Sequence, residues 1–298
     1  MRIVPEHFVA PTQNTSLFAT ASLGAVYFAI PDVNSNYNAM LARLQRRFSK
    51  GLQFDLNYRW SKSIDTYSYE APCACTNQTF PIDNRQERGP SDFDVKHNFV
   101  GSVLWDIPFM RGRKDWTGRL LGGWQINGIV TAHSGFPWTP KVDQSFRLPN
   151  GQFFGPIRPI AFFGQQPLSN TNGNFLQPNG IFPGGGAAYF STTVNTDASG
   201  TPTFQLNAPG IGRNVFRGPR YFSTDMSLVK RFGLPNLGRV SENPNLELRA
   251  NFFNIFNTLN LSPFGSQDSN VFVTNPNFGE AIGALAGRVI ELQARFSF

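Results

Sequence analysis

Residues 52–61 read Leu52-Gln53-Phe54-Asp55-Leu56-Asn57-Tyr58-Arg59-Trp60-Ser61, a strict alternation of apolar and polar side chains. Successive residues of a β-strand point to opposite faces of the sheet, so this period of two predicts a strand with one apolar and one polar face. A tilted strand needs about ten residues to cross a bilayer, whereas strands of soluble proteins have about five or six. The segment therefore indicates a membrane-spanning strand.

The same alternation predicts further strands on both sides of this one. They are Phe99–Ile107, Trp124–His133, Phe222–Leu228, Leu246–Phe252 and Ile290–Phe298, with weaker ones at Ala19–Ile30 and at Asn36–Phe48, whose apolar face would carry Met40, Ala42, Leu44 and Phe48. The side chains that we expect to face lipid are Leu52, Phe54, Leu56, Tyr58, Trp60, Val103, Trp105, Trp124, Ile126, Leu246, Leu248, Phe252, Leu292 and Phe296.

The connections between these strands alternate in length. Short gaps lie at Ser49–Gly51, Pro108–Leu120 and Gly233–Asn245, and long ones at Lys62–Lys96, Gly135–Arg220 and Thr258–Arg288. An up-and-down barrel has short periplasmic turns and long extracellular loops. We therefore predict an all-β fold: an antiparallel up-and-down transmembrane β-barrel segment of about eight strands. Residues 1–18 would be an irregular lead-in, and residues 135–220 a long extracellular loop without regular structure.

Composition agrees with this prediction. Charged residues make up 15% of the chain, against about 25% in a typical soluble domain. The 30 Phe residues suit pleated, half-buried faces, and 28 Gly and 22 Pro indicate many turns. The 26 basic residues, which exceed the 19 acidic ones by seven, are scattered, so we expect no nucleic-acid partner. No run approaches the length of a transmembrane helix.

Several segments resemble the C-terminal barrel region of Oar-like TonB-dependent transporters, the type that carries a carboxypeptidase-regulatory-like domain. The most specific is Glu87-Arg88-Gly89-Pro90-Ser91-Asp92-Phe93-Asp94-Val95-Lys96-His97. The others lie at 35–39, 58–65, 122–128, 134–137, 212–219, 248–257 and 277–279. The resemblance implies a wall segment of a 22-stranded barrel whose plug is driven by TonB, so TonB would act only through N-terminal parts that this chain lacks. The first residues do not read as a signal peptide, and we interpret the chain as a fragment that does not transport its substrate alone.

The remaining motifs do not indicate catalysis, and we expect a protein that is not an enzyme and holds no cofactor. Cys73 and Cys75 form either a loop disulfide or two idle thiols, because a second pair of zinc ligands is missing. The Gly-rich segment 210–214 has no strand-to-helix context and is interpreted as a loop turn. Pairs such as Glu247 with Arg249, or Glu291 with Arg295, would form a polar ladder inside the barrel.

The last residue, Phe298, ends an apolar face and is predicted to be the signal that the barrel assembly machinery reads. Besides that machinery, outer-membrane lipid is the expected partner, and the substrate is left open. Two alternatives also remain open. One is a self-contained small outer-membrane barrel that serves as an adhesin or structural anchor, and the other is a secreted β-rich protein that binds polysaccharide.

Overall fold

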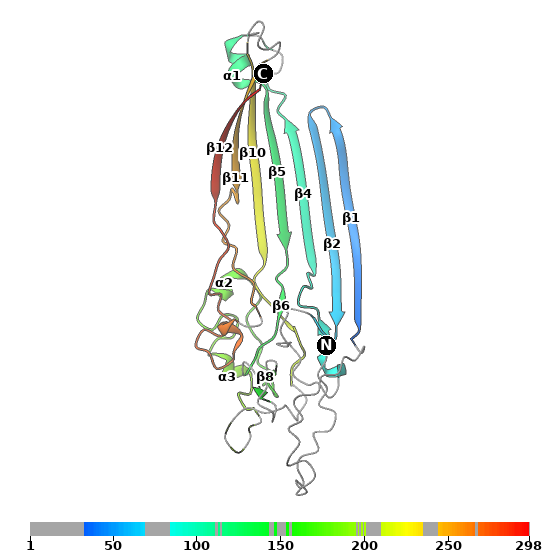
Figure 1. Cartoon of the computed structure of the whole chain (residues 1–298), viewed down its shortest axis with the longest axis vertical. Helices are drawn as coiled ribbons and strands as arrows, with labels where there is room; N and C mark the ends of the chain where they lie inside the picture. Colours follow the sequence, from blue (N-terminus) through cyan, green and yellow to red (C-terminus); the bar gives the residue numbers. More distant parts are fainter. Residues whose placement is uncertain are drawn as a thin grey trace, which may run out of the picture.

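The structure, a computed structural model, describes residues 33–68, 84–110, 113, 115–142, 146–147, 153–154, 157–194, 196, 198, 200, 210–234, 244–265 and 268–297. Its long strands lie side by side in one tall sheet, with the long connections gathered at one end and the short ones at the other (Figure 1). The predicted strand at Ala19–Ile30 lies outside the described residues, as do Cys73, Cys75 and Phe298.

Neighbours along the chain are neighbours in the sheet. The eight-stranded sheet has the order β1-β2-β4-β5-β10-β11-β12, and the two-residue β3 (Gly89–Pro90) extends the loop end of β2. Every pairing is antiparallel. The long strands are β1 (Ser35–Ser49), β2 (Leu52–Asp65), β4 (His97–Asp106), β5 (Trp124–His133), β10 (Tyr221–Gly233), β11 (Asn245–Phe253) and β12 (Val289–Ser297). The all-β, up-and-down, antiparallel prediction is confirmed, and all seven strands lie where alternation predicted them.

The short β1–β2 connection is a two-residue hairpin turn. Lys50 and Gly51 both have positive φ, 51° and 82°, as a type I′ turn requires. A register shift between Arg46 and Ser49 interrupts the pairing just before this turn. Met40, Ala42 and Leu44 lie opposite Trp60, Tyr58 and Leu56, as alternation predicts. Phe48 lies within this irregular stretch and has no cross-strand partner in the register, so its place on the apolar face stays a prediction.

The strand register separates the sheet into two faces. Cross-strand partners share a face, and all fourteen residues that the sequence assigned to lipid share one face through their partners. We define this as the apolar face and its opposite as the polar face. All six acidic residues of the long strands lie on the polar face: Asp55, Asp65, Asp106, Asp225, Glu247 and Glu291.

Side chains on the polar face are linked across the strands. Arg43 binds Asp55 at 2.6 Å, and Gln125 donates to Asp106 at 2.7 Å. Glu247 accepts from Arg231 at 2.8 Å and from Arg249 at 2.9 Å. The predicted pair of Glu247 and Arg249 is therefore present, whereas no hydrogen bond or ion pair joins Glu291 and Arg295 in the described part of the chain, and the place of these residues inside a barrel stays a prediction.

Two of the connections contain regular structure, and for 135–220 this corrects the expectation of a loop without any. The gap Pro108–Leu120 leads into a short helix, α1 (Trp116–Leu121), which forms because Asp115 caps it by accepting from the Gly118 amide at 3.2 Å. The segment 135–220 is not without structure. It contains β6 (Pro137–Trp138), β7 (Phe146–Arg147), β8 (Phe153–Phe154), α2 (Asn172–Phe175), α3 (Gly186–Tyr189) and β9 (Phe216–Arg217), and β6 pairs with β9.

The hydrophobic core lies in the long connections rather than in the sheet. Of the buried apolar residues described, Val229 is the one that belongs to a long strand. The buried Phe residues are Phe175, Phe182, Phe190, Phe264, Phe272 and Phe278, all in connections. The interpretation that the Phe content serves mainly strand faces was therefore incomplete, because this protein also uses Phe to build a separate packed core.

Candidate functional site

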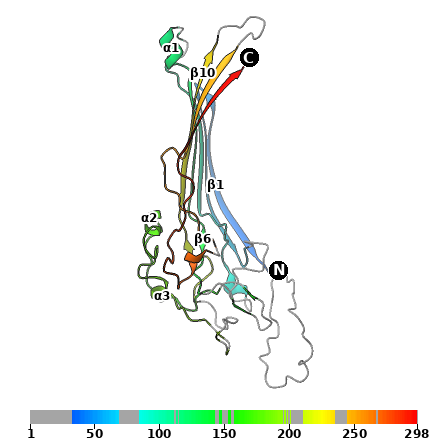
Figure 2. The ribbon, with the colours of Figure 1, turned by 60° about the vertical axis from the view of Figure 1, so that its left-hand side comes forward.

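The described parts of 84–96, 134–219 and 254–288 pack together at one end of the sheet, and we define them as the loop cluster. In both views they lie beyond the same ends of the strands (Figures 1 and 2). The loop cluster also includes two short 3-10 helices, η2 (Asn84–Glu87) and η3 (Ser269–Val271). Binding residues lie most often on loops that a rigid scaffold carries, so we expect a binding site in the loop cluster.

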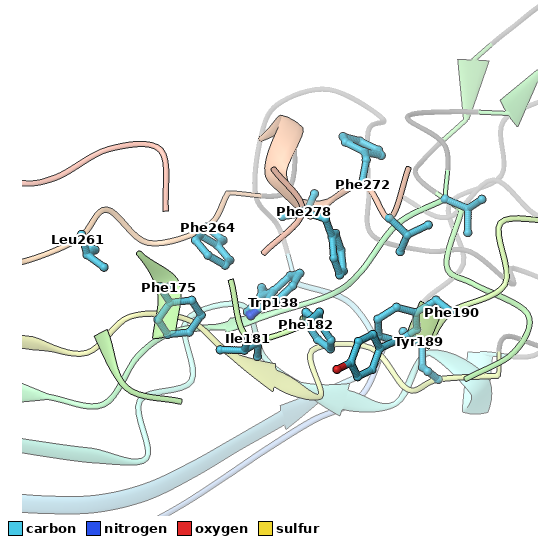
Figure 3. Packing of buried hydrophobic residues seen from close by; sticks show 14 residues of the cluster. Trp138, Phe175, Ile181, Phe182, Tyr189, Phe190, Leu261, Phe264, Phe272 and Phe278 are labelled. Carbon is cyan, nitrogen blue, oxygen red and sulfur yellow. The ribbon is translucent and has the colours of Figure 1, made fainter. Parts of the chain in front are cut away.

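Trp138 lies at the centre of the aromatic core of the loop cluster (Figure 3). Its ring meets Phe264 edge-on with centroids 5.0 Å apart, and Phe182 and Phe278 at 6.0 and 5.8 Å. Each such pair contributes about 0.5–1.5 kcal/mol beyond the burial of its area. Because Phe182 belongs to the connection 135–220 and Phe264 and Phe278 to the connection 258–288, the core joins two loops into one unit.

Backbone hydrogen bonds tie the same two connections together. The Lys141 amide donates to Val271 at 2.9 Å, and the Val273 amide donates to Lys141 at 2.8 Å. Lys141 and Phe272 also form a parallel bridge. The loop cluster is thus held by both side-chain packing and strand-like pairing, which gives it a defined shape.

A buried ionic network attaches the loop cluster to β2. The Arg213 side chain, 1% exposed, binds the carboxylate of Asp65 and donates to the Asp65 carbonyl at 2.9 Å and the Glu87 carbonyl at 3.1 Å. It also reaches Ser68 Oγ at 3.1 Å and Asp92 at 3.3 Å. A buried charge is tolerated only when it is paired and hydrogen-bonded, and Arg213 meets both conditions.

Two more arginines complete this network. Arg158, also 1% exposed, binds Glu87 at 2.8 Å and donates to the Ile211 carbonyl at 3.1 Å. Burial lowers the pKa of the Arg158 guanidinium, and the neighbouring Glu87 carboxylate partly offsets this by raising the pKa. Arg217 binds the carboxylate of Asp94 and donates to its carbonyl oxygen at 2.7 Å. All three arginines come from the connection 135–220, and their acidic partners come from 62–96.

Two backbone features allow the close approach of these segments. A Cβ at Gly89 would lie 2.4 Å from the Arg213 carbonyl oxygen, so glycine is required there. Asn214 adopts a left-handed conformation with φ 59°, and its side chain donates to the Pro90 carbonyl at 2.9 Å. The segment 210–214 lies in a loop, as its sequence predicts, but its sequence does not indicate that Arg213 and Asn214 are buried. Nor does the sequence indicate that segment 212–219 packs against segment 87–97.

Cavities open at the loop end of the sheet. One of about 880 Å³ lies between the ends of β1 and β2 and the segment 214–217. A second, of about 670 Å³, lies over the ends of β4, β5 and β10. A third, of about 240 Å³, lies beside Trp138, whose buried Nε1 has no hydrogen-bond acceptor in the described part of the chain.

Among the described residues, no group of three His, Cys, Asp or Glu side chains is placed to hold a metal ion. None of the helices found there is long and apolar enough to span a membrane.

The class of protein follows from this architecture, an up-and-down antiparallel sheet with long two-faced strands, short turns at one end and long packed loops at the other. The family model of the outer membrane beta barrel domain matches residues 4–291, and the chain belongs to that family. It is accordingly a protein of the bacterial outer membrane. Comparison with curated proteins and with solved structures gave no match.

Proposed function

We propose that this chain is the C-terminal part of the wall of a TonB-dependent outer-membrane transporter, that it takes part in substrate uptake within the complete barrel, and that it has no enzymatic activity. The observation that carries the proposal is the open sheet. Within the described residues, β1 pairs with β2 alone and β12 with β11 alone, which leaves two free edges.

A free edge is costly in a bilayer. Each backbone N–H or C=O without a partner in hydrocarbon costs several kcal/mol, so membrane barrels close. Further strands of a larger barrel would satisfy both edges. Eight strands closed on themselves enclose an interior that side chains fill, whereas the 22-stranded barrels hold a plug. In this proposal TonB acts on the plug, and the barrel assembly machinery inserts the chain.

The distribution of charge supports contact of the apolar face with lipid. Apart from the bulge in β1, the Asp, Glu, Lys, Arg and His residues that the register places on this face are all basic: Arg46, Lys62, His97 and Lys230. They lie towards the two ends of the strands, with the apolar residues between them. Long basic side chains near the ends of a spanning segment can reach the polar interface.

The same reasoning orients the protein. We place the short turns in the periplasm and the loop cluster outside the cell, because barrels of this class have short periplasmic turns and long extracellular loops. Because the chain belongs to an outer-membrane family, we do not retain the alternative of a secreted polysaccharide-binding protein. The alternative of a small closed barrel is decided by the following experiment.

Cysteine cross-linking in outer membranes tests whether the chain closes on itself. In a variant with both native cysteines replaced by serine, Leu292→Cys in β12 is combined with Leu44→Cys in β1 or with Ala25→Cys in the predicted first strand. Ala250→Cys with Leu292→Cys is the positive control, because these residues face each other in the register. We expect the control to form a disulfide and the edge pairs to form none. Disulfides across the edge, found in a scan of adjacent positions, would establish the small closed barrel instead.

A further inference from the structure

The cavity of about 670 Å³ lies at the loop end of the apolar face, and we define it as the rim cavity. Tyr58, Phe99, Ala132 and Phe222 line it and form one cross-strand row on that face. Leu259, half exposed, adds an apolar side chain from the connection after β11. These residues give the rim cavity one apolar stretch, beside the polar strand residues Asn98, His133 and Tyr221.

Basic and polar groups line the rest of the cavity, from the connections and from the first residue of β4. Arg220 is exposed, and its guanidinium has no hydrogen-bond or ion-pair partner in the described part of the chain. Asn172, at the start of α2, fixes the backbone of Arg220, since its side chain accepts from the Arg220 amide at 3.0 Å and donates to the Arg220 carbonyl at 3.3 Å. His97 is exposed, and its Nδ1 lies 2.8 Å from the Tyr58 hydroxyl.

The charge of this region is one-sided. Lys62 lies on the same face of β2 as Trp60, the cross-strand partner of His97, and two residues further along the strand. The Lys62 side chain also has no partner in the described residues. Neither the lining of the rim cavity nor the long strands on this face contribute an Asp or Glu. An anionic group would thus meet only basic and neutral polar groups, while an attached hydrocarbon chain would meet the aromatic row.

We propose that the rim cavity binds a phosphorylated, acylated glycolipid of the outer leaflet, that is, lipopolysaccharide. The acyl portion would lie over Phe99, Ala132 and Phe222, and a phosphate would accept hydrogen bonds from the Arg220 guanidinium, whose planar fork suits phosphate oxygens. The proposal rests on the orientation given above, because the loop end must lie in the outer leaflet. It goes beyond the transport function by assigning a lipid site that needs no substrate and no TonB.

The test measures bound lipid by native mass spectrometry on protein extracted from outer membranes in a mild detergent. Arg220→Gln removes the phosphate-binding group and keeps a polar side chain. Ala132→Trp fills the apolar floor and keeps the charge. The matched controls are Arg231→Gln on the polar face and Ala250→Trp elsewhere on the apolar face. Each of the first two changes should lower glycolipid occupancy by roughly tenfold, since a charge-assisted hydrogen bond of this kind corresponds to about that factor. The controls should keep it.

Three results would overturn the proposal. The first is equal glycolipid occupancy in all variants. The second is a loss of occupancy in Ala132→Trp but not in Arg220→Gln, which would mean that no phosphate is bound there. The third is a bound glycerophospholipid in place of the glycolipid. A separate measurement checks the orientation on which the proposal rests. Labelling of Thr171→Cys by an impermeant maleimide on whole cells shows whether the loop cluster is outside, whatever lipid is bound.

Discussion

Replacing Arg213 by methionine should loosen the loop cluster without unfolding the sheet. Methionine keeps an unbranched apolar stem but removes every hydrogen bond of the guanidinium. The Asp65 side chain, 4% exposed, would then be a buried carboxylate without its cation, and the Glu87 carbonyl would lose a donor. Removal of one partner from a buried ion pair costs about 3–5 kcal/mol. Arg231 provides a matched control, because its side chain is 58% exposed and its pair with Glu247 should contribute less than about 1 kcal/mol.

Hydrogen exchange followed by mass spectrometry resolves the two parts of the molecule. If the loop cluster exchanges through its own opening, a loss of about 3 kcal/mol should speed exchange of amides in 87–94 and 212–218 by about a hundredfold or more. Amides in the centres of β5 and β10 should exchange as in the unmodified protein. Combining Arg213→Met with Asp65→Asn should recover part of the loss, because the uncompensated charge is then gone. Equal exchange in Arg213→Met and Arg231→Met would refute the conclusion that the network holds the loops.

Three further predictions concern the core, the orientation and assembly. Phe182→Ala removes a fully buried ring and should destabilise the loop cluster by about 3–5 kcal/mol, whereas Phe163→Ala at an exposed position should change it little, as measured by limited proteolysis. An impermeant maleimide on whole cells should label Thr171→Cys but not Ser49→Cys in a variant without the native cysteines, and the reverse pattern would contradict the orientation. Deletion of Phe298 should lower the amount of folded protein in outer-membrane fractions, and unchanged amounts would argue against its role as an assembly signal.

The strands could be predicted from the sequence because each carries its own information. Alternation is local, and in Leu52–Ser61 it is visible within ten residues. The short turns then fix which strands are neighbours, as Lys50 and Gly51 do between β1 and β2. Once the neighbouring strands and the phase of the apolar–polar alternation in each strand are known, the residues that share the apolar face can be predicted. The register shows that the fourteen predicted residues share one face.

The loop cluster could not be predicted in this way because its contacts are distant in sequence and have no period. Arg213 and Asp65 are 148 residues apart, and nothing in either segment alone specifies the other. The rings of Trp138 and Phe264 are in contact although these residues are also far apart in the sequence. A weaker signal was present, since the segments 87–97 and 212–219 both combine glycine and proline with charged residues. Opposite charges in two such segments are compatible with an ion pair between them, but neither segment specifies its partner.

The two parts of this protein have different sources of stability, and β2 connects them. The long strands contribute one buried apolar residue to the described part of the chain, Val229, so in the proposed barrel the sheet would depend on its hydrogen-bond ladder, on further strands and on lipid. The loop cluster has an aromatic core of the kind found in soluble domains. Asp65 takes part in both, since it is paired with Ser35 in the ladder and binds Arg213 in the network. A displacement of the loop cluster therefore acts on the end of β2, and through the Thr66 amide, which donates to the Asn34 carbonyl at 3.0 Å, on the start of β1. Within the described residues β1 is an edge of the sheet, so in the proposed barrel we expect a displacement of the loop cluster to act on the contact between β1 and the next strand rather than on the interior of the sheet.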